Sequence, residues 1–213
     1  MKIGILGSGT VAQTLAAGFL KHGHEVTLGT RDTAKLADFV KANGKAKVGG
    51  FADAAKAGEV VVLAVKGSVA AKALELAGAA NLAGKTVIDA SNPIADAPSV
   101  NGVLAFFTDL KSSLMEQLQK QFPAAHFVKA FNSVGAAAMV NPAFKQGGRG
   151  SMFIAGNEAG AKQTVTAILD QFGWDTEDMG AAEAARAIEP LCMLWCIPGL
   201  AKNDWFHAFK MLR

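Results

Sequence analysis

The chain has 213 residues, of which 51% are hydrophobic and 18% are charged, so we expect a folded core and not a disordered chain. The formal net charge is only +3, which argues against nucleic acid as a partner and is compatible with an anionic small ligand. Tyrosine is absent, and this excludes a reductase that donates its proton from a Tyr–Lys pair.

The N-terminal segment, the apolar runs and the cysteines indicate the cellular compartment of the protein. The N-terminus leads directly into the first predicted strand, which leaves no room for a signal peptide. The sequence has no continuous run of about 18 apolar residues, so no membrane span is predicted. The only cysteines are Cys192 and Cys196, and two thiols without a leader favour a reducing, cytoplasmic setting. Because their neighbours are apolar, we interpret them as core residues and not as a redox or metal pair.

Residues 2–35 have the pattern of a dinucleotide-binding unit. A predicted strand, Ile3–Leu6, leads into Gly7-Ser8-Gly9-Thr10-Val11-Ala12, a helix to Lys21 and a second strand, Val26–Gly29. Gly7 permits a tight turn, Gly9 lets the backbone approach a pyrophosphate, and Ala12 is the small residue where helix packs on strand. We expect the pyrophosphate on the free N–H groups of the helix; a glycine turn that binds no nucleotide is the alternative.

Strands and helices alternate through the rest of the chain. The predicted helices are 33–43, 51–58, 69–80, 112–121, 158–172 and 181–194, and the predicted strands are 47–48, 59–65, 86–90, 126–131, 151–156 and 174–179. This order predicts one Rossmann-type α/β domain over residues 1–213, with a doubly wound, mostly parallel sheet. Residues 1–150 are its dinucleotide-binding core, and 151–213 are a small extension of the same sheet.

Such a fold binds its ligand beyond the carboxyl ends of the strands, where strand order reverses. The predicted loops at this edge are Gly7–Ala12, Thr30–Lys35, Val65–Ser68, Ser91–Pro93 and Asn132–Gly135. Val65 and Lys66 are therefore candidate cofactor contacts. We expect the nicotinamide half near a larger set: Ser91, Asn92, Pro93, Lys129, Phe131 and Asn132. Turn chemistry before proline for Asn92, and a strand-end cap for Asn132, are equally good explanations.

The loop after the second strand indicates which nicotinamide cofactor is used. NAD sites usually place an acidic residue there to bind the ribose hydroxyls, whereas this chain has Thr30 and Arg31. A guanidinium binds phosphate through paired hydrogen bonds, Thr30 can donate another, and Lys35 adds charge one helical turn later. The sequence therefore predicts NADP(H), with Asp32 as the acidic alternative if the strand ended one residue later.

No strong general acid is predicted near the nicotinamide. His22, His24 and His126 lie at the opposite ends of strands and His207 lies in the tail, while Lys66 is interpreted as a solvated loop residue. Hydride exchange with a second redox ring needs position more than acid catalysis, so no catalytic residue is assigned and a flavin-type acceptor is favoured. Reduction of a small carbonyl or imine, or an NADPH-binding sensor, are the alternatives.

The combined motifs resemble a known family. Gly7-Ser8-Gly9, Gly29-Thr30-Arg31, Asp89-Ala90-Ser91-Asn92-Pro93, Val128-Lys129-Ala130-Phe131-Asn132, Gly156-Asn157 and Asp178-Met179-Gly180 occur in this order. Together they resemble the NADPH-dependent coenzyme F420 reductases, especially the branch with the oxidoreductase domain of the STEAP metalloreductases.

This resemblance implies hydride exchange between NADP(H) and FMN, FAD or coenzyme F420, without a metal in this domain. It implies that Ser8, Thr10 and Val11 line the pyrophosphate and that Thr30, Arg31 and Lys35 hold the 2′-phosphate. It places Ser91, Asn92, Lys129, Phe131 and Asn132 around the nicotinamide. It also implies a homodimer, for which the apolar tail Asn203–Arg213 is either an interface or a packed C-terminal helix.

Overall fold

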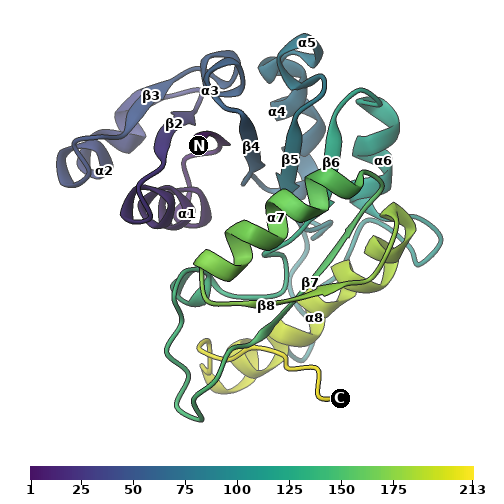
Figure 1. Ribbon diagram of the computed structural model, residues 1–213. Coiled ribbons are helices and arrows are strands. Elements are labelled where there is room, and N and C mark those ends of the chain that lie inside the picture. The colour runs from purple at the N-terminus through teal and green to yellow at the C-terminus, as the bar shows by residue number, and fades with distance from the viewer.

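An eight-stranded sheet with the order β3-β2-β1-β4-β5-β6-β7-β8 runs through the computed structural model, which describes residues 1–213 (Figure 1). The strands are β1 (Lys2–Leu6), β2 (Glu25–Gly29), β3 (Lys47–Gly49), β4 (Val60–Leu63), β5 (Thr86–Asp89), β6 (His126–Lys129), β7 (Ser151–Gly156) and β8 (Asp175–Asp178). Neighbouring strands are parallel except β6 and β7. The predicted doubly wound, mostly parallel sheet with a C-terminal extension is therefore confirmed.

Helices connect the strands and cover both faces of the sheet (Figure 1). The α-helices are α1 (Thr10–Lys21), α2 (Ala37–Ala42), α3 (Phe51–Ala57), α4 (Ala70–Ala77), α5 (Ala79–Leu82), α6 (Leu114–Gln121), α7 (Ala159–Gln171) and α8 (Ala185–Lys202). Short 3-10 turns are η1 (Thr33–Leu36), η2 (Gly67–Val69), η3 (Ala136–Ala138) and η4 (Ala182–Ala184). The predicted helix 69–80 is divided at Gly78, whose φ of 86° is outside the helical region.

The hydrophobic core consists of one cluster on each face of the sheet. In β4, Val60 and Val62 belong to the cluster beneath α1 and α7, whereas Val61 and Leu63 belong to the cluster beneath α3, α4 and α6. Successive side chains of a strand point to opposite faces, so a strand covered on both sides must be apolar throughout. This explains why the continuous run in β4 predicted a central strand.

The C-terminal helix and tail differ from the prediction. α8 continues through Pro198 to Lys202 and ends at Asn203, which has a left-handed conformation with φ 56°. Pro198 cannot donate to the helix, but Leu194, whose carbonyl loses that partner, is 55% exposed and can be solvated. The tail then returns in extended form and is not the packed helix considered above: Ser151 N–H donates to Phe209 O at 2.8 Å, and Met211 N–H donates to Ser151 Oγ at 3.0 Å.

Residues Ala182–Lys202 are also long and apolar enough to cross a membrane by length and composition, with a mean hydropathy of 1.2. The sequence predicts no membrane-spanning helix, because the chain has no uninterrupted run of about 18 apolar residues. Only 33% of this segment is buried, but Glu189 within it is 2% exposed and accepts hydrogen bonds from the backbone N–H groups of Leu114 and Met115. A single such helix is weak support for membrane insertion, since core helices pass the same test.

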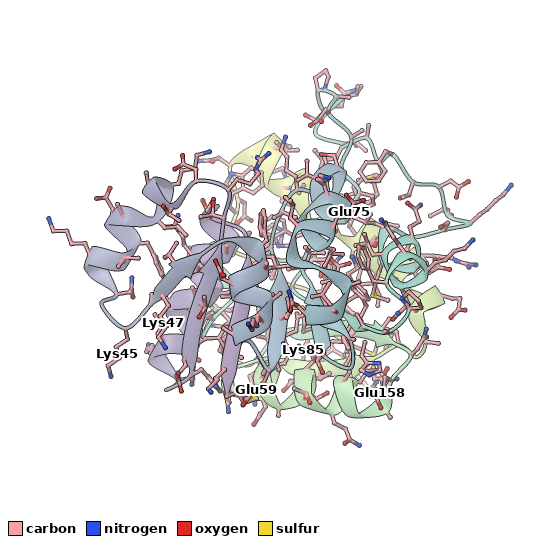
Figure 2. All side chains as sticks on the ribbon, turned by 90° about the horizontal axis from the view of Figure 1, so that it is seen from above. Lys45, Lys47, Glu59, Glu75, Lys85 and Glu158 are labelled. Atoms are coloured by element: carbon pink, nitrogen blue, oxygen red, sulfur yellow. The ribbon has the colours of Figure 1, made fainter.

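The amino ends of the strands carry charged side chains that bind the backbone. Figure 2 labels Lys47, Glu59 and Lys85, which lie at or just before the amino ends of β3, β4 and β5. Lys85 Nζ donates to Ala55 O and Gly58 O, both at 2.7 Å, and so binds free carbonyls at the end of α3. Burial lowers the pKa of Lys85. The charges at this edge thus serve the fold.

An ion pair joins the start of α6 to α8. Ser113 and Glu116 form a capping box, with Ser113 N–H donating to Glu116 Oε2 at 2.8 Å, and Arg186 Nε donates to the same carboxylate at 3.0 Å. Hydrogen bonding by Arg186 is the main cause that lowers the pKa of Glu116 to about 2. Because the pKa in the folded state is lowered, this stabilisation is complete above the ordinary glutamate pKa and is lost as the pH falls towards 2.

We expect Glu116→Gln to lower the free energy of unfolding by about 1–2 kcal/mol at pH 7, and by progressively less towards pH 2. Urea unfolding at several pH values measures this. Glu75→Gln is the matched control, since Glu75 pairs with Lys72 at 3.0 Å on the exposed surface. An equal loss at pH 7 and pH 2 would contradict the role of the Glu116 charge.

Candidate functional site

A cleft with a volume of about 700 Å³ lies at the carboxyl ends of β1, β4 and β5. It is lined by residues 9–11, 64–67, 90–92 and 94–98. The strand order reverses between β1 and β4, and the arrowheads of β4 and β5 point to the same edge in Figure 1. Open α/β sheets bind ligands at such a switch point. The cleft therefore lies where the sequence placed the ligand.

The turn after β1 depends on Gly7. Its φ is 141°, and a Cβ on it would lie 2.3 Å from Ala64 O and 3.3 Å from Ala12 Cβ. Any side chain there would push β4 or α1 away, whereas the small Ala12 is fully buried at the contact. Both positions behave as the glycine motif predicts: they allow strand and helix to approach closely.

The N-terminus of α1 faces the cleft with its first amides free. Gly9 is the N-cap residue and gives no side-chain cap, and the first helical bond runs from Gln13 N–H to Gly9 O. The N–H groups of Thr10, Val11 and Ala12 therefore have no partner within the helix. A Cβ on Gly9 would meet nothing within 4 Å, so the space above these amides is open. Free amides at a positive helix end fit a pyrophosphate.

Ser8 positions this loop through its backbone. Its carbonyl accepts a hydrogen bond from Gln13 Nε2 at 2.9 Å. The loop is thereby tied to the first turn of α1.

Two of the three residues predicted for a 2′-phosphate have free cationic groups. Arg31 and Lys35 are exposed after β2 and form no ion pair. Thr30 is buried, and its hydroxyl bonds to the backbone of Asp32 at 3.2 Å. The Asp32 carboxylate caps η1 by accepting from Ala34 N–H at 3.1 Å. The Asp32 carboxylate is thus occupied in the turn, whereas the side chains of Arg31 and Lys35 are free to bind a phosphate.

Ser91 and Asn92 line the cleft after β5, and Asn132, which lies outside the lining, is hydrogen-bonded to Asn92. Asn92 Nδ2 donates to Asn132 O at 2.8 Å, and Asn132 Nδ2 donates to Asn92 Oδ1 at 3.2 Å and to Ile188 O at 2.9 Å. Asn132 is 3% exposed, and its Oδ1 has no hydrogen-bond partner. Pro93 follows outside the cleft lining and accepts from Phe107 N–H at 2.9 Å.

Phe131 does not line the cleft. The predicted strand through Phe131 ends at Lys129, because Phe131 has a φ of 62°, which a strand cannot contain. Its ring is buried against Phe172 with centroids 6.0 Å apart, and its N–H donates to Met152 Sδ at 3.2 Å. A direct contact between this ring and a nicotinamide is therefore not what the structure shows.

Lys129 lies beneath the cleft and not in it. It is fully buried, and its Nζ lies 2.6 Å from Asp89 Oδ2 and 2.9 Å from Glu189 Oε1. Burial alone would lower the pKa of Lys129, but the two carboxylates outweigh it and the pKa is raised. Lys129 thus stays charged. It does not line the cleft itself, but it is bonded to Ser91, which does. Sequence reasoning did not assign Asp89 or Glu189 to the site. The opposite charges of Asp89 in β5 and Lys129 in β6 were a signal for the first of these, whereas no sequence signal pointed to Glu189 on α8.

A hairpin-like arm, residues 93–107, forms one wall of the cleft and was not predicted. Ala95 N–H donates to Ala105 O at 2.8 Å, and the turn is Asn101-Gly102 with φ values of 51° and 80°. This dipeptide favours a tight hairpin turn and could have revealed the arm. Lys66 Nζ lies 3.1 Å from Asp96 Oδ1, and both side chains are exposed. The ion pair joins the loop after β4 to the arm.

The remaining candidate groups lie outside the cleft. None of the four histidines lines it, and no three His, Cys, Asp or Glu side chains are grouped so that they could hold a metal ion. Cys192 is buried, Cys196 is partly buried, and both are free. A hydrogen bond to Cys196, together with burial, raises the pKa of the Cys192 thiol. The Cys192 thiol therefore does not stand out as a nucleophile, whereas the same hydrogen bond lowers the pKa of Cys196.

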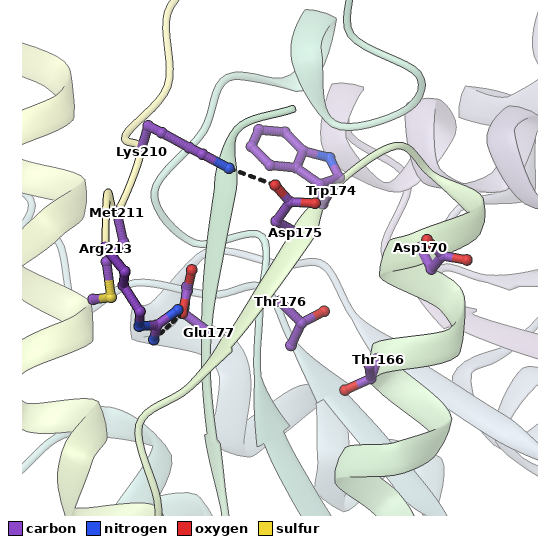
Figure 3. Close-up of a pocket in the computed structure, with 9 residues that line it drawn as sticks. All are labelled: Thr166, Asp170, Trp174, Asp175, Thr176, Glu177, Lys210, Met211 and Arg213. Carbon is purple, nitrogen blue, oxygen red and sulfur yellow. Dashed lines mark hydrogen bonds and ion pairs between the residues drawn. The ribbon is translucent and has the colours of Figure 1, made fainter. Parts of the chain in front are cut away.

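A second cavity, of about 500 Å³, lies between β8 and the tail (Figure 3). Its charged side chains bind one another: Lys210 pairs with Asp175, and Arg213 Nη2 pairs with Glu177 Oε2 at 2.7 Å. These pairs attach the tail to the last strand of the sheet. The cavity lies beside strands far from the switch point between β1 and β4.

Comparison with known proteins agrees with this geometry. Residues 2–93 match the family described as NADP oxidoreductase, coenzyme F420-dependent. A candidate F420-dependent NADP reductase from Arthrobacter sp. FB24, known from its crystal structure, is 37% identical, with 100% of both chains covered and a TM-score of 0.94.

More distant relatives share part of their length with this chain. Metalloreductase STEAP3 of Rattus norvegicus is 32% identical over 212 residues, which are 98% of this chain and 40% of the relative. The chain thus spans about two fifths of the length of such curated relatives. An imine reductase from Streptomyces aurantiacus is 20% identical, covers 91% of this chain and 61% of its own, and has a TM-score of 0.68, which shows a shared fold.

The full-length similarity to the Arthrobacter protein, the glycine turn, the cleft at the switch point and the family match all support the same assignment. The chain belongs to the coenzyme F420-dependent family of NADP oxidoreductases.

Proposed function

We propose that this protein transfers hydride between NADPH and a flavin or deazaflavin acceptor such as FMN, FAD or coenzyme F420. NADPH would supply a hydrogen with its electron pair from the dihydronicotinamide, and the acceptor would take that hydride and a proton from solvent. The protein would hold the pyrophosphate on the α1 amides and the 2′-phosphate on Arg31 and Lys35. Its residues would bring the two rings together.

The composition of the cleft is the observation that carries this proposal. Its walls are mostly small or apolar, and they include Val11, Ala64, Val65 and Ala90. Its only titratable side chains, Lys66 and Asp96, pair with each other at 3.1 Å at the exposed side. An apolar slot with paired charges suits a planar ring better than a carbonyl that must be protonated by the protein.

Two other functions are compatible with a bound NADPH. Reduction of a small carbonyl or imine would require a proton donor, which Lys66 could provide only by leaving Asp96. A sensor would bind NADPH and transmit its presence to a partner without turnover. Neither alternative has a specific side-chain arrangement that favours it over ring-to-ring transfer.

The absorbance of NADPH at 340 nm, followed with FMN, FAD, F420 and a panel of carbonyls and imines, distinguishes these functions. We expect oxidation with at least one ring acceptor and none above background with carbonyls. Turnover with carbonyls or imines alone would favour the second function. Tight NADPH binding without oxidation by any acceptor would favour the sensor.

A homodimer and a cytoplasmic location stay predictions from the sequence. The exposed aromatic side chains of the tail, Trp205 at 40% and Phe206 at 45%, are compatible with a subunit interface. Sedimentation of the chain with and without residues 203–213 would test the interface.

A further inference from the structure

A buried cluster of three charges lies beneath the cleft. We call Asp89, Lys129 and Glu189 the buried triad; their side chains are 0–2% exposed. Asp89 comes from β5, Lys129 from β6 and Glu189 from α8, and β5 and β6 pair Asp89 with Lys129 in register. The Glu189 carboxylate also accepts from Leu114 N–H at 2.9 Å and Met115 N–H at 3.0 Å. All members are thus fully bonded.

Stability alone does not explain such a cluster. Buried ion pairs lose so much hydration that apolar residues of the same size are often as stable or more so. The triad has one positive and two negative groups, so part of the compensation for the second carboxylate comes only from the backbone N–H groups at the start of α6. Its position directly below a cleft residue suggests a different role.

Asp89 and Lys129 form hydrogen bonds with the N–H, the carbonyl and the hydroxyl of Ser91. Asp89 Oδ1 accepts from Ser91 N–H at 2.9 Å and from Ser91 Oγ–H at 2.5 Å. Lys129 Nζ donates to Ser91 O at 3.0 Å. The hydroxyl hydrogen is therefore committed to Asp89, and the lone pairs of Ser91 Oγ are the remaining polar capacity of this residue.

We propose that Asp89 and Lys129 of the buried triad form a positioning device that fixes the Ser91 hydroxyl as a hydrogen-bond acceptor for the carboxamide N–H₂ of the nicotinamide. This inference rests on the proposed function. Asp89 and Lys129 bond to Ser91 directly, whereas Glu189 makes no bond to Ser91 and is not part of the device. The carboxamide has an N–H₂ donor, whereas the acetyl group of the 3-acetylpyridine analogue of NADP⁺ has none, so Ser91 discriminates between these two ligands.

The test compares the dissociation constants of NADP⁺ and of its 3-acetylpyridine analogue by calorimetry. We expect wild type to favour NADP⁺, and Ser91→Ala to shift the ratio of the two constants towards the analogue by about two- to tenfold, the value of one neutral hydrogen bond. Asp89→Asn should shift the ratio similarly. Whichever way the asparagine amide is turned, its Nδ2 faces a group that only donates, either Lys129 Nζ or the Ser91 backbone N–H, so the bonds that fix Ser91 are disrupted.

Glu189→Gln is the matched control, because it removes the same charge from the triad as Asp89→Asn but leaves the Asp89–Ser91 bonds in place. We expect its ratio to equal that of wild type. An equal shift in Glu189→Gln and Asp89→Asn would contradict the positioning role and assign the effect to charge. Ser91→Ala leaves the triad paired, so it decides the question even if Asp89→Asn does not fold.

Binding of 2′,5′-ADP separates this inference from the proposed function. This ligand has the 2′-phosphate but no nicotinamide, so Ser91→Ala should bind it like wild type. If wild type binds neither 2′,5′-ADP nor NADP⁺, the proposed function fails. If both bind and the ratio is the same in wild type and Ser91→Ala, the role of Ser91 and the triad fails while the proposed function stands.

Discussion

Arg31→Ala should weaken NADPH binding by about 10- to 150-fold while NADH binding stays within about twofold of wild type. Arg31 is exposed after β2 and has no acidic partner, so its guanidinium is free for a phosphate. Hydrogen bonds to charged groups are worth about 1.5–3 kcal/mol, which sets this range. Fluorescence titration with NADPH, NADH and 2′,5′-ADP measures the effect.

Lys41→Ala is the control for general charge, since Lys41 is a cation near the end of α2. It should leave the ratio of the affinities for NADPH and NADH unchanged. Lys35→Ala should lower this ratio less than Arg31→Ala does, because a lysine binds phosphate as a single point charge. Equal losses of NADPH and NADH binding in Arg31→Ala would show that Arg31 does not bind the 2′-phosphate.

Local patterns in the sequence were sufficient for most of the fold. The run Val60–Leu63 is apolar throughout because both of its faces are buried, and Gly7 is required because Ala64 O lies where a Cβ would be. Such constraints act between close neighbours or along one element, so the sequence records them directly. The exposed Arg31 was predictable for the same reason, since it directly follows β2.

Features that depend on several elements meeting were not predictable in this way. The interpretation of Lys129 as a neighbour of the nicotinamide failed to anticipate its burial, because that depends on Asp89 in the next strand and Glu189 on α8. Glu189 lies 75 residues after Leu114, whose amide it accepts from, and no sequence spacing indicates that contact. The aromatic side chain of Phe131 similarly gave no sign of its left-handed backbone.

Lys129→Met should lower the free energy of unfolding by about 3–5 kcal/mol, because it leaves the carboxylates of Asp89 and Glu189 buried without their cation. For a chain of this length the loss corresponds to a fall in Tm of roughly 6–20 °C. Calorimetry at pH 7 measures it. Lys72→Met is the control: Lys72 pairs with Glu75 at 3.0 Å on the surface, where an ion pair contributes about 0–1 kcal/mol.

The surface control separates the effect of burial from the loss of a lysine charge alone. Lys129→Met and Lys72→Met each remove one lysine, but only Lys129 is fully buried between two carboxylates. The loss of unfolding free energy in Lys129→Met should therefore exceed that in Lys72→Met by about 2–5 kcal/mol. A loss no larger than that of Lys72→Met would mean that Asp89, Lys129 and Glu189 are not a charged cluster in the folded protein.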